Sequence, residues 1–200
     1  MEAIESMLTG GHPNSMGRTV EVVELVVADR SRLEELFGCY GSADPVVRLR
    51  TSSALKRLEA ARHEWLVPFA DRLIDDVGML DQPSAQWTLA KLLLRLTPDL
   101  TPDQSRRATV ILQRNLEQQH DWIVLINTME TLSAWSAGDP ALRAWLDPQL
   151  ERLAGDPRTS VAERARNLTA RTRGDRMPSG APSADGALRV AVSASRRGPR

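Results

Sequence analysis

The chain has 200 residues, of which 42% are hydrophobic and 26% are charged, and its 26 basic and 26 acidic side chains balance. This composition is typical of a globular protein with a substantial core. The single cysteine, Cys39, excludes an intramolecular disulfide and a cysteine-based zinc cluster, and it favours a reducing, cytoplasmic setting.

Residues 1–172 show apolar side chains at spacings of three and four, which predicts helices almost throughout. The β-branched run Val20–Val27 is interrupted by Glu21 and Glu24, and its valines keep helical spacing, so it is also interpreted as helix. The amino terminus has no basic and apolar leader, and the apolar stretch Leu92–Leu94 is broken by Arg95. We therefore expect an all-α protein with neither a secretion signal nor a membrane span.

A helical phrase at residues 44–58 returns at a nearly constant interval. Its apolar stripe occupies one helix face, at Val47, Thr51, Ala54, Leu55 and Leu58. Shifts of 38 and 77 residues give two further stripes, at Ala85, Leu89, Leu92, Leu93 and Leu96, and at Val124, Thr128, Thr131, Leu132 and Trp135. Weaker copies lie at the two ends, at Ser15, Thr19, Val22, Val23 and Val26, and at Val161, Ala165 and Leu168. A period of this size predicts stacked helical pairs with atypical ends.

Partner helices are expected between these copies, over Ser31–Phe37, Glu64–Val77, Pro102–Gln118 and Pro140–Leu153. Thr101 with Gln104 predicts a capping box, and Asp139 and Asp156, each followed by proline, predict capped helix starts. Pro68 and Pro148 lie inside their segments and should kink or restart the helix.

These phrases, above all Asp44-Pro45-Val46-Val47-Arg48 with Ala54-Leu55, resemble HEAT repeats. The resemblance covers nearly all of residues 1–172 and implies a right-handed α-solenoid of about five antiparallel helix pairs that serves as an interaction scaffold. It also implies an inter-repeat structural role for Asp44, Arg48 and Arg50, which match the family's ladder of Asp and Arg. Arg48 aligns with Gln86, Leu125 and Ala162 in the other copies, so a regular ladder through the array is not expected.

Leu49, Trp87 and Ile126 align on the side of the repeated helices opposite the core stripe. In a solenoid this row faces the concave side, where it would suit a groove that receives an apolar helix or peptide. The flanking positions one turn further along are Ser53, Lys91 and Glu130. The alternative is that the row fills space between neighbouring helices. Of the other tryptophans, Trp65, Trp135 and Trp145 are expected in the core, and Trp122 is expected to be partly exposed.

Few residues are placed in the sequence so that they could act in catalysis or bind a metal ion or a nucleotide. His12, His63 and His120 are scattered, Cys39 has no basic neighbour, and Gly10-Gly11 lacks a following Lys-Ser or Lys-Thr pair. We therefore expect no enzyme activity, no cofactor and no metal site.

Residues 173–200 are rich in Gly, Pro, Ser and Arg and predict a disordered basic tail. Residues 171–200 hold seven arginines against two aspartates, a balance of +5, which leaves about −5 on the body. Contact of this tail with nucleic acid, an anionic surface or the body remains an alternative to a solubilising role.

The leading function hypothesis is a non-enzymatic scaffold or adaptor that binds a protein or peptide. The alternative is a HEAT-like DNA-binding or alkylated-base glycosylase-type repair protein, in which Trp87, Asp121 and Arg50 would act on the concave face. The acidic body disfavours nucleic acid as a partner. A third class is a regulatory or assembly subunit of an enzyme, which the sequence does not separate from a free adaptor.

Overall fold

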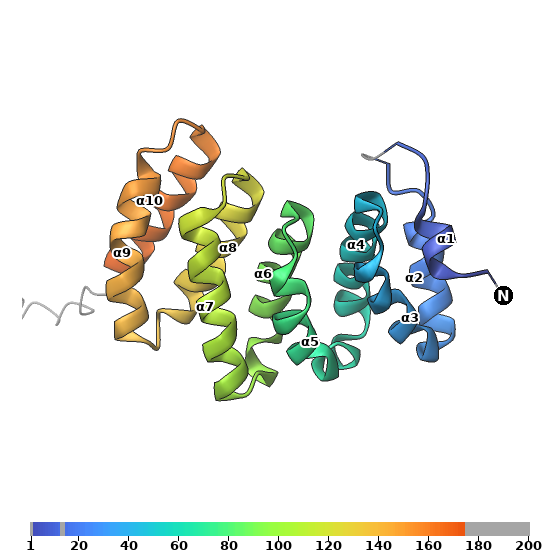
Figure 1. The fold of residues 1–200 in the computed structure, drawn as a ribbon. Coiled ribbons are helices and arrows are strands. Elements are labelled where there is room, and N and C mark those ends of the chain that lie inside the picture. Colours follow the sequence, from blue (N-terminus) through green and yellow to red (C-terminus); the bar gives the residue numbers. More distant parts are fainter. Residues whose placement is uncertain (1, 13–14, 175–200) are drawn as a thin grey trace, which may run out of the picture.

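The computed structural model describes residues 2–12 and 15–174, and within them the chain is helical with no β-strand, which confirms the predicted all-α class. The helices lie side by side in a row that follows the order of the sequence (Figure 1). They are α1 (Ile4–Leu8), α2 (Thr19–Ala28), α3 (Leu33–Gly38), α4 (Pro45–Ala61), α5 (Ala70–Asp75), α6 (Pro83–Leu96), α7 (Pro102–Gln118), α8 (Trp122–Trp135), α9 (Pro140–Ala154) and α10 (Thr159–Gly174).

Short 3-10 turns join several of these helices: η1 (Arg30–Arg32), η2 (Cys39–Gly41), η3 (His63–Trp65), η4 (Val67–Phe69), η5 (Val77–Met79) and η6 (Thr97–Asp99). The last helix, α10, runs two residues past the predicted boundary at residue 172. The rest of the predicted disordered tail, residues 175–200, lies outside the described residues.

Capping side chains start most of the long helices. Thr101 and Gln104 form the predicted capping box at the start of α7, and Asp139 accepts hydrogen bonds from two backbone N–H groups at the start of α9. These two predictions are confirmed. The predicted start at Asp156 is wrong: α10 begins at Thr159, because the Asp156 carboxylate binds the backbone and guanidinium of Arg158 instead. That pairing lowers the pKa of Asp156 to about 2.

The even-numbered helices form a continuous chain of contacts, in which α2 packs on α4, α4 on α6, α6 on α8 and α8 on α10. Each odd-numbered helix packs on the even-numbered helix that follows it. Most of these contacts join helices that are one or two places apart in the sequence. The fold is therefore built from local contacts, in which each helix pair packs against the next pair.

The core lies between the two sets of helices, on the stripes that the repeat predicts. All of the aligned apolar positions of α4, α6 and α10 are buried, and so are those of α8 except Trp135, which is half-buried. The copy at α2 is incomplete, because Ser15 is exposed ahead of the helix and Val23 is only partly buried. The stripe alignment is therefore confirmed in the middle of the row and weaker at its first helix.

The segment predicted as one helix from Glu64 to Val77 is broken into η3, η4, the six-residue α5 and η5. Pro68 occupies η4, where a missing backbone N–H and a fixed φ suit a short turn. Helix α9, in contrast, continues through Pro148 to Ala154. The expected interruption thus occurs at Pro68, whereas at Pro148 the helix does not restart.

The tryptophans divide as the sequence predicts. Trp65, Trp135 and Trp145 pack against the core as half-buried side chains, and Trp122 is 47% exposed at the start of α8. Trp135 also donates a hydrogen bond from its indole to the hydroxyl of Thr97, 2.8 Å away.

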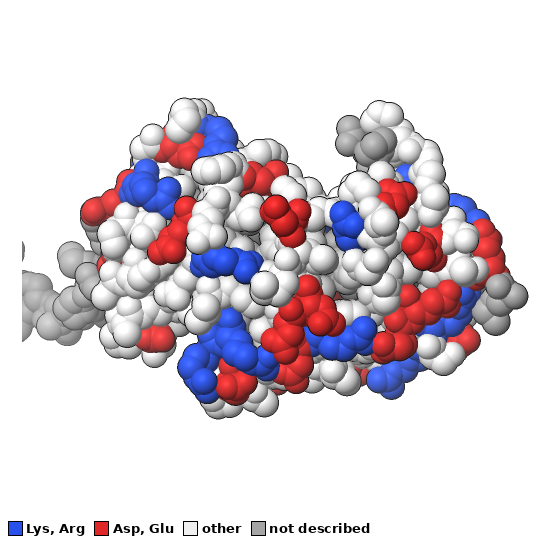
Figure 2. Space-filling model, viewed as in Figure 1, with Lys and Arg blue, Asp and Glu red and all other residues white. Residues whose placement is uncertain are grey.

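Ion pairs join successive odd-numbered helices along one edge of the molecule. Arg72 of α5 binds Glu34 of α3, and Arg107 of α7 binds Asp71 and Asp75 of α5. Figure 2 shows these helices under a band of interleaved acidic and basic side chains. Cations along this edge are therefore matched by carboxylates.

Candidate functional site

The aligned residues Leu49, Trp87 and Ile126 lie on α4, α6 and α8, which contact one another in that order. All three side chains are half-buried. Leu49 and Trp87 line one pocket of about 280 Å³, together with Ser53, so the structure brings these three predicted site residues together. Ile126 packs against the core instead. We call Leu49, Trp87 and Ile126 the apolar row.

The two remaining predicted site residues lie further along the same helices. Lys91 is exposed one turn beyond Trp87. Glu130 pairs with Arg164 of α10 at 3.2 Å and lines a separate pocket of about 390 Å³ with Arg143 and Arg171. Glu130 therefore belongs to the α8–α10 end of the surface and not to the pocket at Trp87.

The segment between α1 and α2 supplies one wall of the pocket at Trp87, and we call its described residues, 9–12 and 15–18, the N-terminal loop. Ser15 and Met16 line the pocket, and the Met16 side chain is 40% exposed. The alignment of helices does not identify these residues, because they precede α2 and belong to no repeated stripe. Met16 is a polarizable, flexible apolar side chain, and such side chains adapt to varied ligand surfaces.

Arg50 holds this loop in place. Its side chain is buried, and its guanidinium donates hydrogen bonds to four backbone carbonyls, those of Leu8, Gly10, His12 and Ser15. Guanidinium N–H groups that neutralise loop carbonyls remove the cost of burying them. The structural role predicted for Arg50 thus falls on the loop in front of α2, not on an Asp of the next repeat.

Gly17 is required by the same packing. Its φ is +49°, and a Cβ at this position would lie 2.8 Å from Cζ of Arg50. A side chain there would meet both a left-handed backbone and an occupied site. The loop, Gly17 and Arg50 therefore form one unit that shapes the pocket.

Asp44 and Arg48 do not form a ladder. The Asp44 carboxylate caps α4 by accepting from the Val46 N–H at 2.8 Å. Arg48 donates to the carbonyl of Ser42 and to the amide oxygen of Gln82, which precedes α6. Arg48 therefore links α4 to the residue that precedes α6, without a carboxylate partner.

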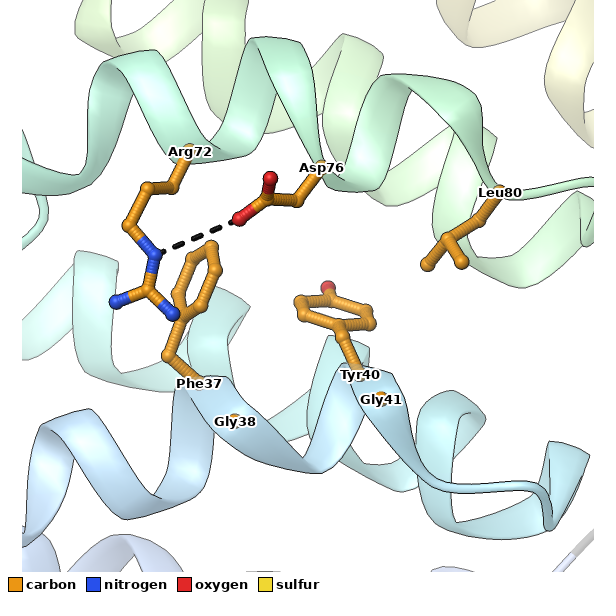
Figure 3. Close-up of a pocket in the computed structure, with 7 residues that line it drawn as sticks. All are labelled: Phe37, Gly38, Tyr40, Gly41, Arg72, Asp76 and Leu80. Atoms are coloured by element: carbon orange, nitrogen blue, oxygen red, sulfur yellow. Dashed lines mark hydrogen bonds and ion pairs between the residues drawn. The ribbon is translucent and has the colours of Figure 1, made fainter.

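A second pocket, of about 290 Å³, lies between α3–η2 and α5–η5 (Figure 3). The rings of Phe37 and Tyr40 form its floor, and the guanidinium of Arg72 lies 4.3 Å from the Phe37 ring centroid. Its polar groups are already paired: Arg72 with Asp76 and Glu34, and the Tyr40 hydroxyl with Ser52. This pocket therefore lies at a packing contact between α3–η2 and α5–η5, and its polar side chains already have partners within the protein.

His63 bridges two carboxylates. Its Nδ1 lies 3.0 Å from Glu59 and its Nε2 lies 2.8 Å from Asp99, which comes from the next unit. The hydrogen bonds to Glu59 and then to Asp99 raise the pKa of His63 above its ordinary value of 6.5. The protonated imidazole therefore links the C-terminal end of α4 to the turn that follows α6.

The ion pairs of His63 predict that the stability of the folded chain depends on pH. Because the pKa of His63 is raised in the folded chain, its contribution is fully present below about pH 6.5 and is lost as pH rises through the folded pKa. We expect the melting temperature of the parent to fall, relative to that of His63→Gln, as the pH rises from about 6.5 through the range in which the folded His63 loses its proton. Thermal melts of both proteins across this range measure the difference. If the melting temperatures of the two proteins changed with pH in the same way, the proposed contribution of His63 would be contradicted.

The other candidate chemical groups stand apart. Cys39 is buried, and burial, followed by the charges of Glu5 and Glu35, raises the pKa of its thiol to about 11. His120 is exposed, and its carbonyl accepts from Arg158. Asp121 caps α8 through the N–H groups of Ile123 and Val124.

Within residues 2–12 and 15–174, no three His, Cys, Asp or Glu side chains are placed to share a metal ion. In the same part of the chain, no helix has the length and apolar character needed to cross a membrane.

Comparison with known proteins gives no relative. The chain matches no protein-family model, no curated protein and no solved structure.

Proposed function

We propose that residues 1–172 form a HEAT-like, right-handed α-solenoid of five antiparallel helix pairs that acts as a non-enzymatic scaffold for a protein or peptide. The pairs would be α1/α2, α3/α4, α5/α6, α7/α8 and α9/α10. Side-chain contacts between successive helix pairs support this arrangement, because they join residues 34 to 38 positions apart, close to the period of the repeat: Arg48 with Gln82, His63 with Asp99, and Trp135 with Thr97. Arrays of this kind present one set of helices as an extended binding surface.

The observation that carries the proposal is the pocket between α4 and α6. Leu49 and Trp87 contribute apolar side chains to a recess that is open to solvent, and Met16 adds a third. Its volume of about 280 Å³ suits a single apolar side chain of a partner. Tryptophan is enriched among residues that dominate binding energy, because it buries a large rigid surface in one contact.

Two contacts weigh against the glycosylase-type alternative. The Arg50 guanidinium is buried and is occupied by backbone carbonyls, and the Asp121 carboxylate is occupied as the cap of α8. A catalytic carboxylate and a phosphate-binding arginine both need free donor or acceptor atoms at an open surface. Trp87 and Arg50 both line the pocket, but the donors of Arg50 are already taken by backbone carbonyls.

A peptide selection tests the proposal. A phage-displayed peptide library is panned on the purified full chain, and the selected peptides are titrated by fluorescence anisotropy. Trp87→Gln and Leu49→Gln are expected to weaken binding by roughly thirtyfold, the loss typical of an interface anchor. Their melting temperatures should stay within about 3 °C of the parent, because neither side chain is fully buried.

Val110→Gln is the matched control, because Val110 is an apolar residue that is 62% exposed on α7, an odd-numbered helix. This variant should bind as the parent does. A library that yields no peptide would overturn the proposal. A large loss of stability in Trp87→Gln would instead assign Trp87 to packing between helices.

A further inference from the structure

Four cations gather on α4 and α6 beyond the pocket, and we call them the cation cluster: Lys56, Arg57, Lys91 and Arg95. Arg57 follows Leu49 by eight residues, and Arg95 follows Trp87 by the same number. At 1.5 Å per residue, each arginine lies about 12 Å along its helix from the apolar row. Positions eight apart share a helix face, so the row and the cluster belong to one surface.

The cluster's charges act on one another. Lys56 is half-buried, and its pKa is lowered first by burial and then by the positive charges of Lys91, Arg57 and Arg95. Like charges held together raise the electrostatic free energy of the site, which an arriving anion would lower.

The described part of the chain supplies little compensation for these charges. Arg95 pairs with Glu59, but Glu59 also binds His63. Arg57 contacts the sulfur of Met16 at 3.3 Å, and within the described residues neither it nor the two lysines forms an ion pair. This differs from the edge of the odd-numbered helices in Figure 2, where Arg72 and Arg107 meet carboxylates. Three of the four cations on α4 and α6 therefore keep a positive charge that no described carboxylate pairs with.

We propose that this surface binds an acidic amphipathic peptide, with an apolar side chain in the pocket at Leu49 and Trp87 and carboxylates on the cation cluster. The inference rests on the proposed function and adds the charge of the partner. Charge complementarity carries it: an apolar recess and a group of four cations, of which only Arg95 pairs with a carboxylate in the described part of the chain, lie on the same two neighbouring helices. Electrostatic complementarity of this kind sets partner choice and register more than bulk hydrophobic area does.

A peptide fits the surface better than a nucleic acid. In the alignment of the repeated helices, Glu21 and Glu24 of α2 correspond to Ser53 and Lys56 of α4. Glu130 of α8 corresponds to Lys91 of α6. Glu24 and the ion-paired Glu21 and Glu130 border the cluster on both sides, so the unpaired cations do not continue onto α2 and α8 as a continuous phosphate backbone would require. Neighbouring helices pack about 10 Å apart, and a site two helices wide matches a few carboxylates.

The peptides selected in the library experiment provide the probe. We expect them to be acidic and to bind about tenfold more weakly when their Glu and Asp residues are replaced by Gln and Asn. Their affinity for the full chain should also fall as salt rises from 0.05 to about 0.5 M, because exposed ion pairs are screened. The double variant Arg57→Glu/Lys91→Glu should lose the acidic peptide and bind a lysine-substituted version instead. Both substituted side chains lie at exposed positions, so folding is retained.

Arg106→Glu is the control for a simple change of net charge, since Arg106 is an exposed residue of α7. It should leave peptide affinity unchanged. Neutral or basic selected peptides, or equal affinity after charge removal, would overturn the inference while leaving the peptide scaffold intact. A library without binders overturns the scaffold itself. Single-stranded or duplex DNA that displaces the peptide and binds more tightly at the same salt would assign the cluster to nucleic acid and overturn the inference.

Discussion

Replacing Arg50 by methionine is expected to lower the free energy of unfolding by about 3 kcal/mol, because a buried guanidinium that serves several carbonyls is worth more than one ordinary hydrogen bond. The change removes the donors to Leu8, Gly10, His12 and Ser15 together. Methionine fills much of the same volume but offers no N–H. For a chain of this size the melting temperature should fall by roughly 10 °C.

The same substitution should also disorganise the pocket at Trp87, because Met16 and Ser15 form its wall only while the loop is held. Urea unfolding measures the stability, and amide hydrogen exchange measures the opening of the described loop residues. Gly17→Ala should act in the same direction, since its Cβ would approach Cζ of Arg50 within 2.8 Å. Arg106→Met, at an exposed arginine, should change stability by less than about 0.5 kcal/mol. An Arg50→Met variant as stable as this control would contradict the role of Arg50.

The sequence predicts the core of this fold well, because burial follows helical period. The stripe positions of α4 and α6 are all buried, as the shift of 38 residues predicts. The caps at Thr101 and Asp139 are also predictable, because their hydrogen bonds are made within a few residues of the cap. Such features need no knowledge of which helix packs on which.

Loop anchors and surface charge were predicted less well, because they depend on contacts between distant residues. The contacts of Arg50 span 35 to 42 residues and end on a loop that has no repeated pattern. The acidic body disfavours nucleic acid as a partner, yet the structure separates its charges, with matched pairs along α3, α5 and α7 and the cation cluster on α4 and α6. A net charge does not record this separation.

One apparent mismatch in the repeat has a structural explanation. Arg48 aligns with Gln86, which cannot continue the ladder of Asp and Arg that is common in HEAT repeats. In the structure, Arg48 donates to the carbonyl of Ser42, and Gln86 donates to the carbonyls of the turn at Val77–Leu80. The two side chains therefore perform one task, which is to satisfy the carbonyls of the turn that precedes their own helix. A position can keep its role while its charge changes, because the acceptors are backbone atoms.

Replacing Gln86 by leucine is accordingly expected to cost about 3 kcal/mol, although leucine has a similar volume. Gln86 is fully buried, and its amide donates to the carbonyls of Val77, Gly78 and Leu80. Its oxygen accepts from the Asn115 amide at 2.7 Å, and Asn115 is itself buried on α7. Leucine would leave these groups without partners inside the core, where each unpaired polar group carries its full desolvation cost.

Urea unfolding of Gln86→Leu, Asn115→Leu and the double variant separates the direct bond from the turn carbonyls. The double variant should be less destabilised than the sum of the single ones, with a coupling of about 1–2 kcal/mol, because the second change removes the orphaned Asn115 amide. Gln118→Leu, at an exposed position of α7, should stay within about 0.5 kcal/mol of the parent. Additive effects at 86 and 115 would show that the two amides do not act as a pair. The remaining loss in the double variant measures what the turn at residues 77–80 contributes to joining α5 and α6, and hence to holding Trp87 in position beside α4.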